Sequence, residues 1–346
     1  MVRNDSLPCP QVTVLKNPLT IAGGGLAGLS LAIALRRHGV DVTVHEAGNY
    51  PRHRVCGEFI SGVTESTLER LGITDAFHSS TSLSSASWSD RHGQIREMHV
   101  TGRGISRWRL DDTLQQQFVA LGGTIITRSR TAPAPGTIWA AGRPRQEGPW
   151  IGLKCHARDI ALSHDLEMHL GTNGYLGLAK IEDGKINICG LFRKPVNPDK
   201  KNTHLLVDMV RRGGLEQLAR RLESASLDES SFCGVAGFIT GRQPSNGFSI
   251  GDATHMIPPF TGNGMSMAFQ AAETALPHAL SYARGTTSWE AAAADCSSDL
   301  ESRFRTRMIA SAGIHPILTS ARGAATVSTL SRKRLLPIQP LLHLLR

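Results

Sequence analysis

The chain has 346 residues, of which 40% are apolar and 19% are charged, as in ordinary globular proteins and unlike disordered or fibrous ones. That length predicts two domains, or one domain with a large insertion. The formal net charge of +9 attracts anions in general, but the basic residues are dispersed and form no aromatic-interleaved patch, which argues against nucleic-acid binding.

Residues 1–18 are predicted to be a loose leader before the first strand. They lack the apolar core and the small-residue cleavage site of a secretory signal. The chain has six cysteines, none of them in a Cys-x-x-Cys pair or in a His/Cys cluster with zinc spacing. We therefore expect free thiols in a cytoplasmic protein, and no metal site.

The stretch from Leu19 to Glu46 organises the chain and reads LTIAGGGLAGLSLAIALRRHGVDVTVHE. It predicts a strand over 19–22, a helix over 26–38 that ends at Gly39, and a second strand over 40–45. Two other interpretations are a glycine-rich turn beside a buried helix, and a membrane span. The uncharged run is short and interrupted by glycines at its start, which disfavours the span.

Three glycines and one acid in this unit have the spacing of a dinucleotide-binding turn. Gly23 allows the tight turn, Gly25 lets the backbone approach a pyrophosphate, and Gly28 lets the helix pack on the strand. The helix N-terminus offers free N–H groups to phosphates. Glu46 follows at the end of the second strand, where it can accept hydrogen bonds from a ribose diol. The stretch therefore predicts a dinucleotide site.

Between residues 47 and 148, a loop rich in Arg, Gly and Pro is followed by short helices and strands. One helix is expected over 64–71, ended by Gly72. Another is expected over 111–121, capped by Asp111 or Asp112. β-branched and apolar runs predict strands over four ranges: 83–89, 94–100, 124–127 and 137–141.

From Trp150 to Phe192 the pattern becomes antiparallel, with a hairpin turn at 182–185. Four short strands are expected here: 150–157, 166–171, 175–181 and 185–192. They stand between two parts of the nucleotide fold, so they should form an inserted or interleaved substrate sheet. Helices are expected over 204–222, broken at Gly213-Gly214, and over 287–308.

A second distinctive stretch, Ser249–Leu276, combines an acid with a helix start. Asp252 follows a short predicted strand over 248–250 and can accept a hydrogen bond from a polyol hydroxyl. Thr261-Gly262-Asn263-Gly264 then leads into a predicted helix over 265–276, whose first N–H groups face whatever lies in front of them.

At this point the chain resembles a known family. GGGLAG with Glu46, followed by GDATHMIPPFTGNGMSMA, looks like the FAD-dependent group that joins aromatic hydroxylases of the para-hydroxybenzoate hydroxylase type with the geranylgeranyl reductases. ISRWRLD is similar to that group's Arg-x-x-Leu-Asp stretch, and RVCGEF resembles the Cys-Gly-Glu segment of the reductase branch. The resemblance implies an α/β protein with a Rossmann-like FAD-binding fold of the glutathione-reductase type and an interleaved antiparallel substrate sheet.

The resemblance also implies roles for individual residues. Arg54 and Arg107 would lie on the pyrophosphate side of the flavin, and Asp252 would hold the ribityl chain. NADPH or NADH would bind transiently as the donor, because the chain has a single nucleotide fingerprint. The residues implied to bind FAD are Gly23, Gly25, Gly28, Glu46, Arg54, Arg107, Gly251, Asp252, Gly262, Gly264, Met265 and Ser266.

The chain departs from the family in several segments. Residues 140–144 read Ala-Ala-Gly-Arg-Pro and lack the acid of the usual Asp-Gly segment, which puts in doubt a contact made by flavin and pyridine nucleotide. Gly174–Leu178 stands where the reductase branch has Tyr-x-Trp-x-Phe-Pro. The Trp-x-Trp-x-Ile-Pro segment of flavin halogenases is absent, and the chain is shorter than most relatives.

We therefore expect an FAD-dependent oxidoreductase, and we favour a monooxygenase acting on a small aromatic or apolar substrate. The alternative is a flavin-dependent reductase of the prenyl or geranylgeranyl type. A remote alternative is a non-catalytic lipid carrier of the Rab escort type, which the intact glycines and acids oppose. The sequence specifies neither the substrate nor the oligomeric state.

Cys56 is the tentative catalytic residue, because Arg52 and Arg54 would favour its thiolate near the flavin. The alternative is a small side chain packed under the isoalloxazine. Glu58 would be an acid–base group or the ion-pair partner of a local arginine. His255 would line the cavity or satisfy a backbone carbonyl.

On the predicted substrate strands, Tyr175, His156 and His169 could each face either side of the sheet. Lys154 could face an acidic substrate, but a lysine whose amine reaches solvent is the commoner arrangement.

The expected division of the chain is a leader at 1–18, an FAD-binding domain at 19–75 with 102–148 and 230–285, a substrate domain at 76–101 with 149–229, and C-terminal helices at 286–346. The end of the chain, 332–346, is basic and apolar. It favours a terminal helix docked on the core over a peripheral contact with a membrane surface.

Overall fold

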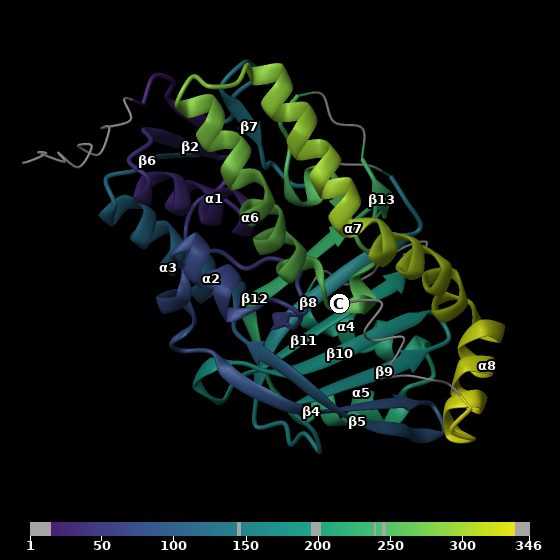
Figure 1. The fold of residues 1–346 in the computed structure, drawn as a ribbon. Coiled ribbons are helices and arrows are strands. Elements are labelled where there is room, and N and C mark those ends of the chain that lie inside the picture. The colour runs from purple at the N-terminus through teal and green to yellow at the C-terminus, as the bar shows by residue number, and fades with distance from the viewer. Residues whose placement is uncertain (1–14, 144–146, 195–201, 239, 244–246, 336–346) are drawn as a thin grey trace, which may run out of the picture.

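Two sheets of different character organise the structure (Figure 1). It is a computed structural model that describes residues 15–143, 147–194, 202–238, 240–243 and 247–335. The expected leader therefore lies almost wholly outside the described residues, and so does most of the basic C-terminal segment.

The first sheet is parallel, as the βαβ pattern predicted. Its strand order is β6 (Thr124–Thr127), β2 (Val42–Glu46), β1 (Leu19–Ala22) and β7 (Thr137–Trp139). Helix α1 (Leu26–Arg37) joins β1 to β2, and Gly39 follows it with a φ of +80°. From Leu26 to Leu35 every residue of α1 is buried, which explains why this helix carries no charge over most of its length.

The second sheet has eight strands and curls away from the first. In order they are β12 (Ser226–Ala236), β8 (Trp150–Arg158), β11 (Ile186–Arg193), β10 (Gly174–Lys180), β9 (Leu166–Gly171), β4 (Thr81–Asp90), β5 (Gly93–Gly104) and β3 (Phe59–Ile60). All neighbours pair antiparallel except β4 and β9, which are parallel. The four predicted strands between Trp150 and Phe192 are thus present, at the centre of a larger mixed sheet.

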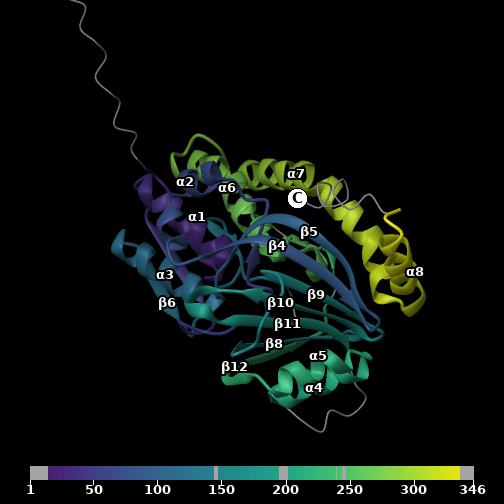
Figure 2. The same cartoon turned by 90° about the horizontal axis from the view of Figure 1, so that it is seen from below.

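One face of this sheet is covered by two helices, α4 (Thr203–Arg212) and α5 (Glu216–Glu223), as Figure 2 shows. Their apolar side chains pack on Leu153, Cys155, Leu176 and Ile188 in one continuous core. Because side chains alternate along a strand, the residues between these on the same strands face the other way, toward the first sheet.

Helix α2 (Glu65–Leu71) is capped by Thr64 and ended by Gly72, as predicted. Helix α3 corrects a prediction, because it spans Arg107–Ala120 and its cap is Ser106, whose Oγ accepts a hydrogen bond from the Arg109 N–H. Asp111 does not cap it and is instead buried in its second turn.

The C-terminal helices are longer than the sequence indicated. Helix α6 (Gly264–Ala283) continues through Pro277, and α7 (Trp289–Thr319) runs on through Pro316 into α8 (Ala321–Arg332) beside β5. The predicted strand at 248–250 forms only a single bridge, Trp139 to Ser249. A further two-stranded ladder joins β13 (Gly241–Arg242) and β14 (His255–Met256).

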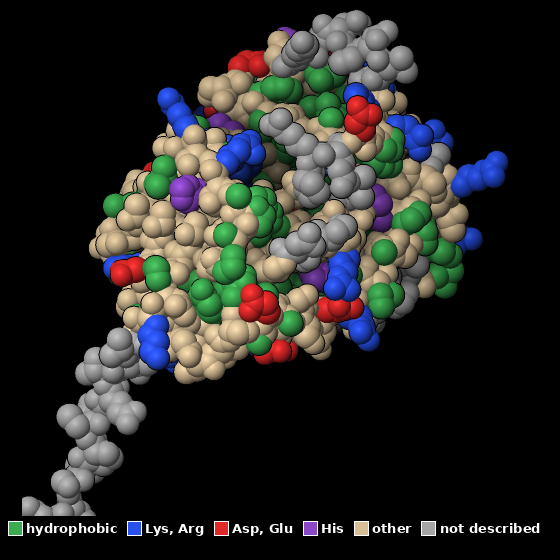
Figure 3. Space-filling view, turned by 90° about the horizontal axis from the view of Figure 1, so that it is seen from above, with side chains coloured by type: hydrophobic (Ala, Val, Ile, Leu, Met, Phe, Trp, Pro, Cys, Tyr) green, Lys and Arg blue, Asp and Glu red, His purple; other side chains and the backbone are tan. Residues whose placement is uncertain are grey.

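The surface and the helices bear on two other expectations. On the face drawn in Figure 3, Lys and Arg side chains are spread among acidic and uncharged ones and form no stripe. None of the described helices has the length and apolarity needed to span a membrane.

Candidate functional site

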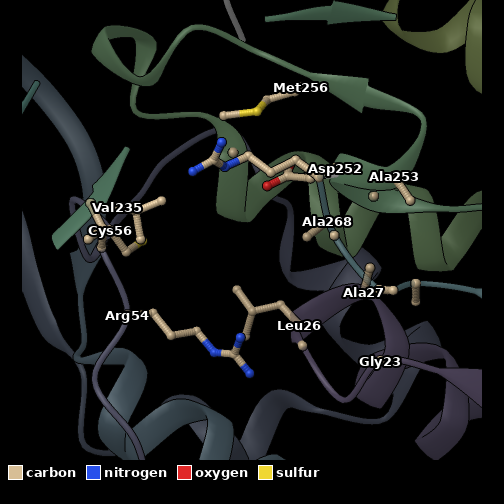
Figure 4. A pocket seen from close by; sticks show the side chains of 18 of the residues that line it. Gly23, Leu26, Ala27, Arg54, Cys56, Val235, Asp252, Ala253, Met256 and Ala268 are labelled. Carbon is tan, nitrogen blue, oxygen red and sulfur yellow. The ribbon is translucent and has the colours of Figure 1, made fainter. Parts of the chain in front are cut away.

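A cavity of about 1440 Å³ opens between the two sheets. Ligand pockets for single small molecules are usually ~300–1,000 Å³, so this one has room for a large ligand and a second molecule. Its walls differ in chemistry (Figure 4). We call the part lined by Gly23, Gly25, Glu46, Arg52, Arg54, Arg107 and Asp252 the polar lobe, and the part lined by Cys56, Gly152, Tyr175, Leu191, Val235 and Phe238 the apolar lobe.

The glycine turn of the polar lobe has three distinct constraints. Gly23 has a φ of +110°, and a Cβ there would lie 2.3 Å from the Ala140 carbonyl oxygen. A Cβ on Gly28 would lie 2.0 Å from the Gly23 carbonyl oxygen, so this glycine allows α1 to pack on β1. A Cβ on Gly25 would meet nothing within 4 Å, because Gly25 faces the cavity. The turn thus leaves open the space that a phosphate group needs next to the backbone.

Glu46 is buried at the end of β2, and backbone N–H groups already hold its carboxylate. Oε2 accepts from the Gly24 N–H at 3.0 Å and Oε1 from the Gly48 N–H at 2.8 Å. Arg52 makes an ion pair with Oε1 at 3.0 Å. An ionised carboxylate has about four acceptor positions, so Glu46 can still receive a hydroxyl from the cavity.

Two arginines of the polar lobe are oriented by Asp111, a fully buried acid that the sequence analysis treated only as a cap. Asp111 accepts from Arg54 Nε at 2.8 Å, and from Arg107 Nε and Nη2 at 2.7 and 2.9 Å. Burial lowers the pKa of Arg107, but the charge of Asp111 outweighs it and raises that pKa above its usual value. The signal that could have identified Asp111 is its spacing of four residues from Arg107 on one helix face.

Arg54 has a donor to spare. Its side chain extends into the cavity (Figure 4), and its buried Nη2 has no hydrogen-bond partner. A buried donor without a partner costs free energy that a ligand oxygen can recover. The arrangement therefore fits an anionic group placed between Arg54 and the glycine turn.

Asp252 lies on the opposite side of the polar lobe, in a short 3₁₀ turn over Gly251–Ala253 in which Gly251 has a φ of +66°. Its carboxyl group faces the cavity. Burial raises its pKa, while Arg107 and Arg143 act in the opposite sense. An oxygen acceptor is thus held inside the cavity, where a polyol hydroxyl could reach it.

The start of α6 also borders the cavity. Gly262, with a φ of +67°, and Gly264 and Met265 line it, and a Cβ on Gly264 would meet nothing within 4 Å. Ser266 differs, because its hydroxyl donates to the Ser61 carbonyl away from the cavity. The helix N-terminus therefore faces open space next to Asp252.

Cys56 lines the wall opposite Gly23 and Ala27 (Figure 4). Burial raises the pKa of its thiol, and the nearby Arg107 only partly offsets this. The expectation of a thiolate favoured by Arg52 and Arg54 is therefore wrong in direction, because burial outweighs the arginines. The bland alternative, a small neutral side chain at the cavity wall, fits the geometry.

A buried charged cluster joins the loop that carries Cys56 to the second sheet. Glu58 has a positive φ of 53° and pairs with Lys154 Nζ at 3.2 Å and with His156 Nε2 at 2.7 Å. Lys154 also contacts His53 Nδ1 at 3.0 Å. Lys154 is fully buried, so the prediction of a solvent-reaching lysine is wrong. Glu58 pairs with this lysine and not with a local arginine.

The protonation of this cluster follows from its contacts. Burial opposes ionisation of Glu58, yet the hydrogen bond from His156 and the charge of Lys154 hold its pKa below the usual value. Burial and Lys154 lower the pKa of His53 to about 4. The cluster is therefore an ionised Glu58–Lys154 pair with a neutral His53 at its edge.

The other weighed residues fall on different sides of the sheet. Tyr175 lines the cavity. His169 pairs with Glu167 on the opposite side, because its register partner is Leu176, which faces α4 and α5. His255 is buried but is not a lining residue, and its Nδ1 has no hydrogen-bond partner. Within the described residues, no group of three or more His, Cys, Asp or Glu is placed to hold a metal ion.

Comparison with known families adds one partial match. A family model described as pyridine nucleotide-disulphide oxidoreductase matches residues 18–95, which contain the glycine turn, Glu46 and the loop with Arg54 and Cys56. No curated protein sequence matches the chain.

Solved structures resemble the chain over almost its whole length. HpxO of Klebsiella pneumoniae, solved with FAD and uric acid, is 15% identical with a TM-score of 0.73 and covers 97% of each chain. PqsL of Pseudomonas aeruginosa, solved with 2-aminobenzoylacetate, is 16% identical with a TM-score of 0.68 and covers 90% of this chain and 99% of its own. The flavin-dependent brominase Bmp2 is 16% identical with a TM-score of 0.74 and covers 95% of this chain and 93% of its own.

Identities this low show the fold alone. The chain has the α/β fold of the FAD-dependent monooxygenases, with a parallel Rossmann-like sheet and a curled mixed sheet. The predicted fold class and the resemblance to the para-hydroxybenzoate hydroxylase group are thereby confirmed at the level of the fold.

Proposed function

We propose that this protein is an FAD-dependent monooxygenase that acts on a small apolar substrate, with NADPH or NADH as the electron donor. The observation that carries the proposal is a single large cavity in which an open glycine turn and a helix start face an apolar lobe. A dinucleotide and a small molecule could therefore meet in one enclosed space.

The residues of the polar lobe fit FAD from one end to the other. The open side of Gly25 and the unpartnered Nη2 of Arg54 suit the pyrophosphate. Glu46 suits the adenosine ribose and Asp252 the ribityl chain. The isoalloxazine ring would then lie against Gly262, Gly264 and Met265.

Bound FAD supplies the redox chemistry, taking electrons from the pyridine nucleotide and using them to activate oxygen. The protein's own contribution is electrostatic and steric. The N-terminus of α6 stabilises negative charge on the ring edge in front of it. The apolar lobe excludes water and holds the substrate beside the ring.

The electron donor has no nucleotide-binding domain of its own in the described residues, since the only parallel βαβ unit with a glycine turn is the one at β1, α1 and β2. Arg143 also stands in the segment where the family has an acid. We therefore propose a transient donor that approaches the cavity opening and leaves after reduction.

The test is a reduction experiment on the purified, FAD-loaded protein. The visible spectrum is recorded, NADPH or NADH is added under nitrogen, and air is then readmitted. Bleaching by a nucleotide and recovery in air support the monooxygenase. A yellow protein that neither nucleotide bleaches would overturn the donor and favour a reductase served by another electron carrier. A colourless protein that cannot be loaded with FAD would sink the enzyme and leave a lipid carrier.

A further inference from the structure

The floor of the apolar lobe is one row of residues across four strands of the second sheet. In register, Tyr175 on β10 lies opposite Leu191 on β11, Leu191 opposite Gly152 on β8, and Gly152 opposite Val235 on β12. All four line the cavity. Register partners share a face of the sheet, so this row presents two aliphatic side chains, one gap and one phenol.

The gap at Gly152 is already used. A Cβ there would lie 2.8 Å from the Phe238 ring and 2.8 Å from Val55 Cγ1. Phe238 therefore rests directly on the backbone of β8 and adds an aromatic wall to the lobe. With Leu191 and Val235 beside it, the lobe offers an apolar surface with few polar atoms.

The Tyr175 hydroxyl is the exception. Tyr175 is 4% exposed, and its hydroxyl has no hydrogen-bond partner. Burial, together with the nearby Cys189, raises its pKa well above the usual value, so the group stays a neutral phenol that can donate its proton. A buried hydroxyl without a partner costs ~1–3 kcal/mol, which a ligand acceptor would recover.

Cations around the apolar lobe are already engaged. Arg143, at its edge, lies over the Phe238 ring with its guanidinium carbon 4.3 Å from the centroid, and it donates to the carbonyls of Gly237 and Ala236. Lys154, in the next row of the sheet, is paired with Glu58. Among the described residues that line this lobe, none offers an uncommitted positive charge to an anionic substrate.

Together these observations point to the kind of molecule that the lobe accepts. We propose that Tyr175 recognises an uncharged, largely apolar substrate through one oxygen or nitrogen acceptor. The lobe disfavours an ionised carboxylate, because it would be desolvated there without a counter-charge. This assignment rests on the proposed function only in naming the ligand a substrate; the binding preference itself stands on the lobe.

The test measures binding of three probes of one shape: 2-naphthol, naphthalene and 2-naphthoate. They are titrated by calorimetry into the FAD-loaded wild type, Tyr175→Phe and Tyr282→Phe, a control that keeps all lining residues. We expect 2-naphthol to bind the wild type about tenfold more tightly than either other probe, which corresponds to ~1.4 kcal/mol. Tyr175→Phe should remove that advantage and leave naphthalene binding within about twofold, and Tyr282→Phe should change neither.

Three results would overturn the assignment: tighter binding of 2-naphthoate than of 2-naphthol, equal loss of 2-naphthol and naphthalene binding in Tyr175→Phe, or no binding of any probe. Unfolding midpoints of the variants show whether a loss reflects misfolding. Uptake of FAD, followed by absorption, is read separately. A protein that takes up no FAD but keeps the probe preference would overturn the proposed function and not this inference.

Discussion

The two lobes of the cavity are built in opposite ways. The polar lobe takes its glycine turn and Glu46 from one continuous unit of the chain, and its charges come in pairs, such as Arg107 with Asp111. The apolar lobe takes single residues from four strands and leaves one hydroxyl unpaired. A site for a common cofactor is thus written in a local motif, whereas a site for a particular substrate depends on register between distant strands.

A charged cluster stands where the two constructions meet. Glu58 belongs to the loop that carries Arg54 and Cys56, and its partners Lys154 and His156 belong to the second sheet. Buried ion pairs are a poor source of net stability but are costly to break from one side. We infer that this cluster holds the loop against the sheet. The following experiments act on the two lobes and on their junction.

The largest effect is expected at the junction. Lys154→Met should lower the free energy of unfolding by about 3–5 kcal/mol, because Glu58 is left as a buried carboxylate without its lysine. Urea denaturation of the purified protein measures this change. The exposed Lys333 provides the matched control, since Lys333→Met should change stability by less than ~0.5 kcal/mol.

Adding Glu58→Gln to Lys154→Met should restore part of the lost stability, because neither charge then remains unpaired. If Lys154→Met alone costs less than ~1 kcal/mol, a range typical of exposed ion pairs, the cluster does not hold the two halves together.

In the polar lobe, Gly25→Val should weaken FAD binding by at least about 100-fold, or ~2.7 kcal/mol. The added side chain would enter the cavity and would clash with nothing in the protein itself. FAD titration followed by fluorescence gives the dissociation constant, and the stability of the FAD-free protein should be unchanged.

Gly28→Val is the contrasting variant for that experiment. Its side chain would overlap the Gly23 carbonyl, so it should destabilise the FAD-free protein, by ~1–3 kcal/mol or more. Equal effects of the two variants on FAD binding and on stability would contradict the separate roles of these glycines.

A smaller effect is expected at Asp252. Asp252→Ala should weaken FAD binding about tenfold, or ~1.4 kcal/mol, through loss of one acceptor. Asp252→Asn should lose less, since its amide oxygen still accepts. The same titration measures both variants, and an Asn variant as weak as the Ala variant would show that charge matters here more than the hydrogen bond.

The smallest effect is expected at Cys56, on the wall of the apolar lobe. Because burial raises its pKa above the model value of 9.0, its alkylation by iodoacetamide at neutral pH should be slower than that of an unfolded thiol and should accelerate above pH 9. Cys56→Ser should leave the rate of flavin reduction by NAD(P)H within about threefold. Fast alkylation at pH 7, or loss of reduction in the Ser variant, would restore a catalytic role for this thiol.

Several features of the fold could be predicted from the sequence because their causes are local. The βαβ unit follows from glycine spacing and apolar periodicity, and Thr64 and Gly72 at the ends of α2 are ordinary cap residues. The start of α3 was misplaced because Ser106 and Asp111 are both good capping residues. Only the burial of Asp111 between two arginines shows why the serine takes that position.

The sequence by itself determined the parallel sheet, the glycine turn, the acids Glu46 and Asp252, and the expectation of FAD, because each depends on residues close together in the chain. Tertiary structure alone decided which face of β8 and β10 meets the cavity, and it is this that buries Lys154, turns His169 away and leaves the Tyr175 hydroxyl unpaired. The physical reason is that a strand alternates its faces. Which face is buried depends on strands and helices that pack against it from far along the chain.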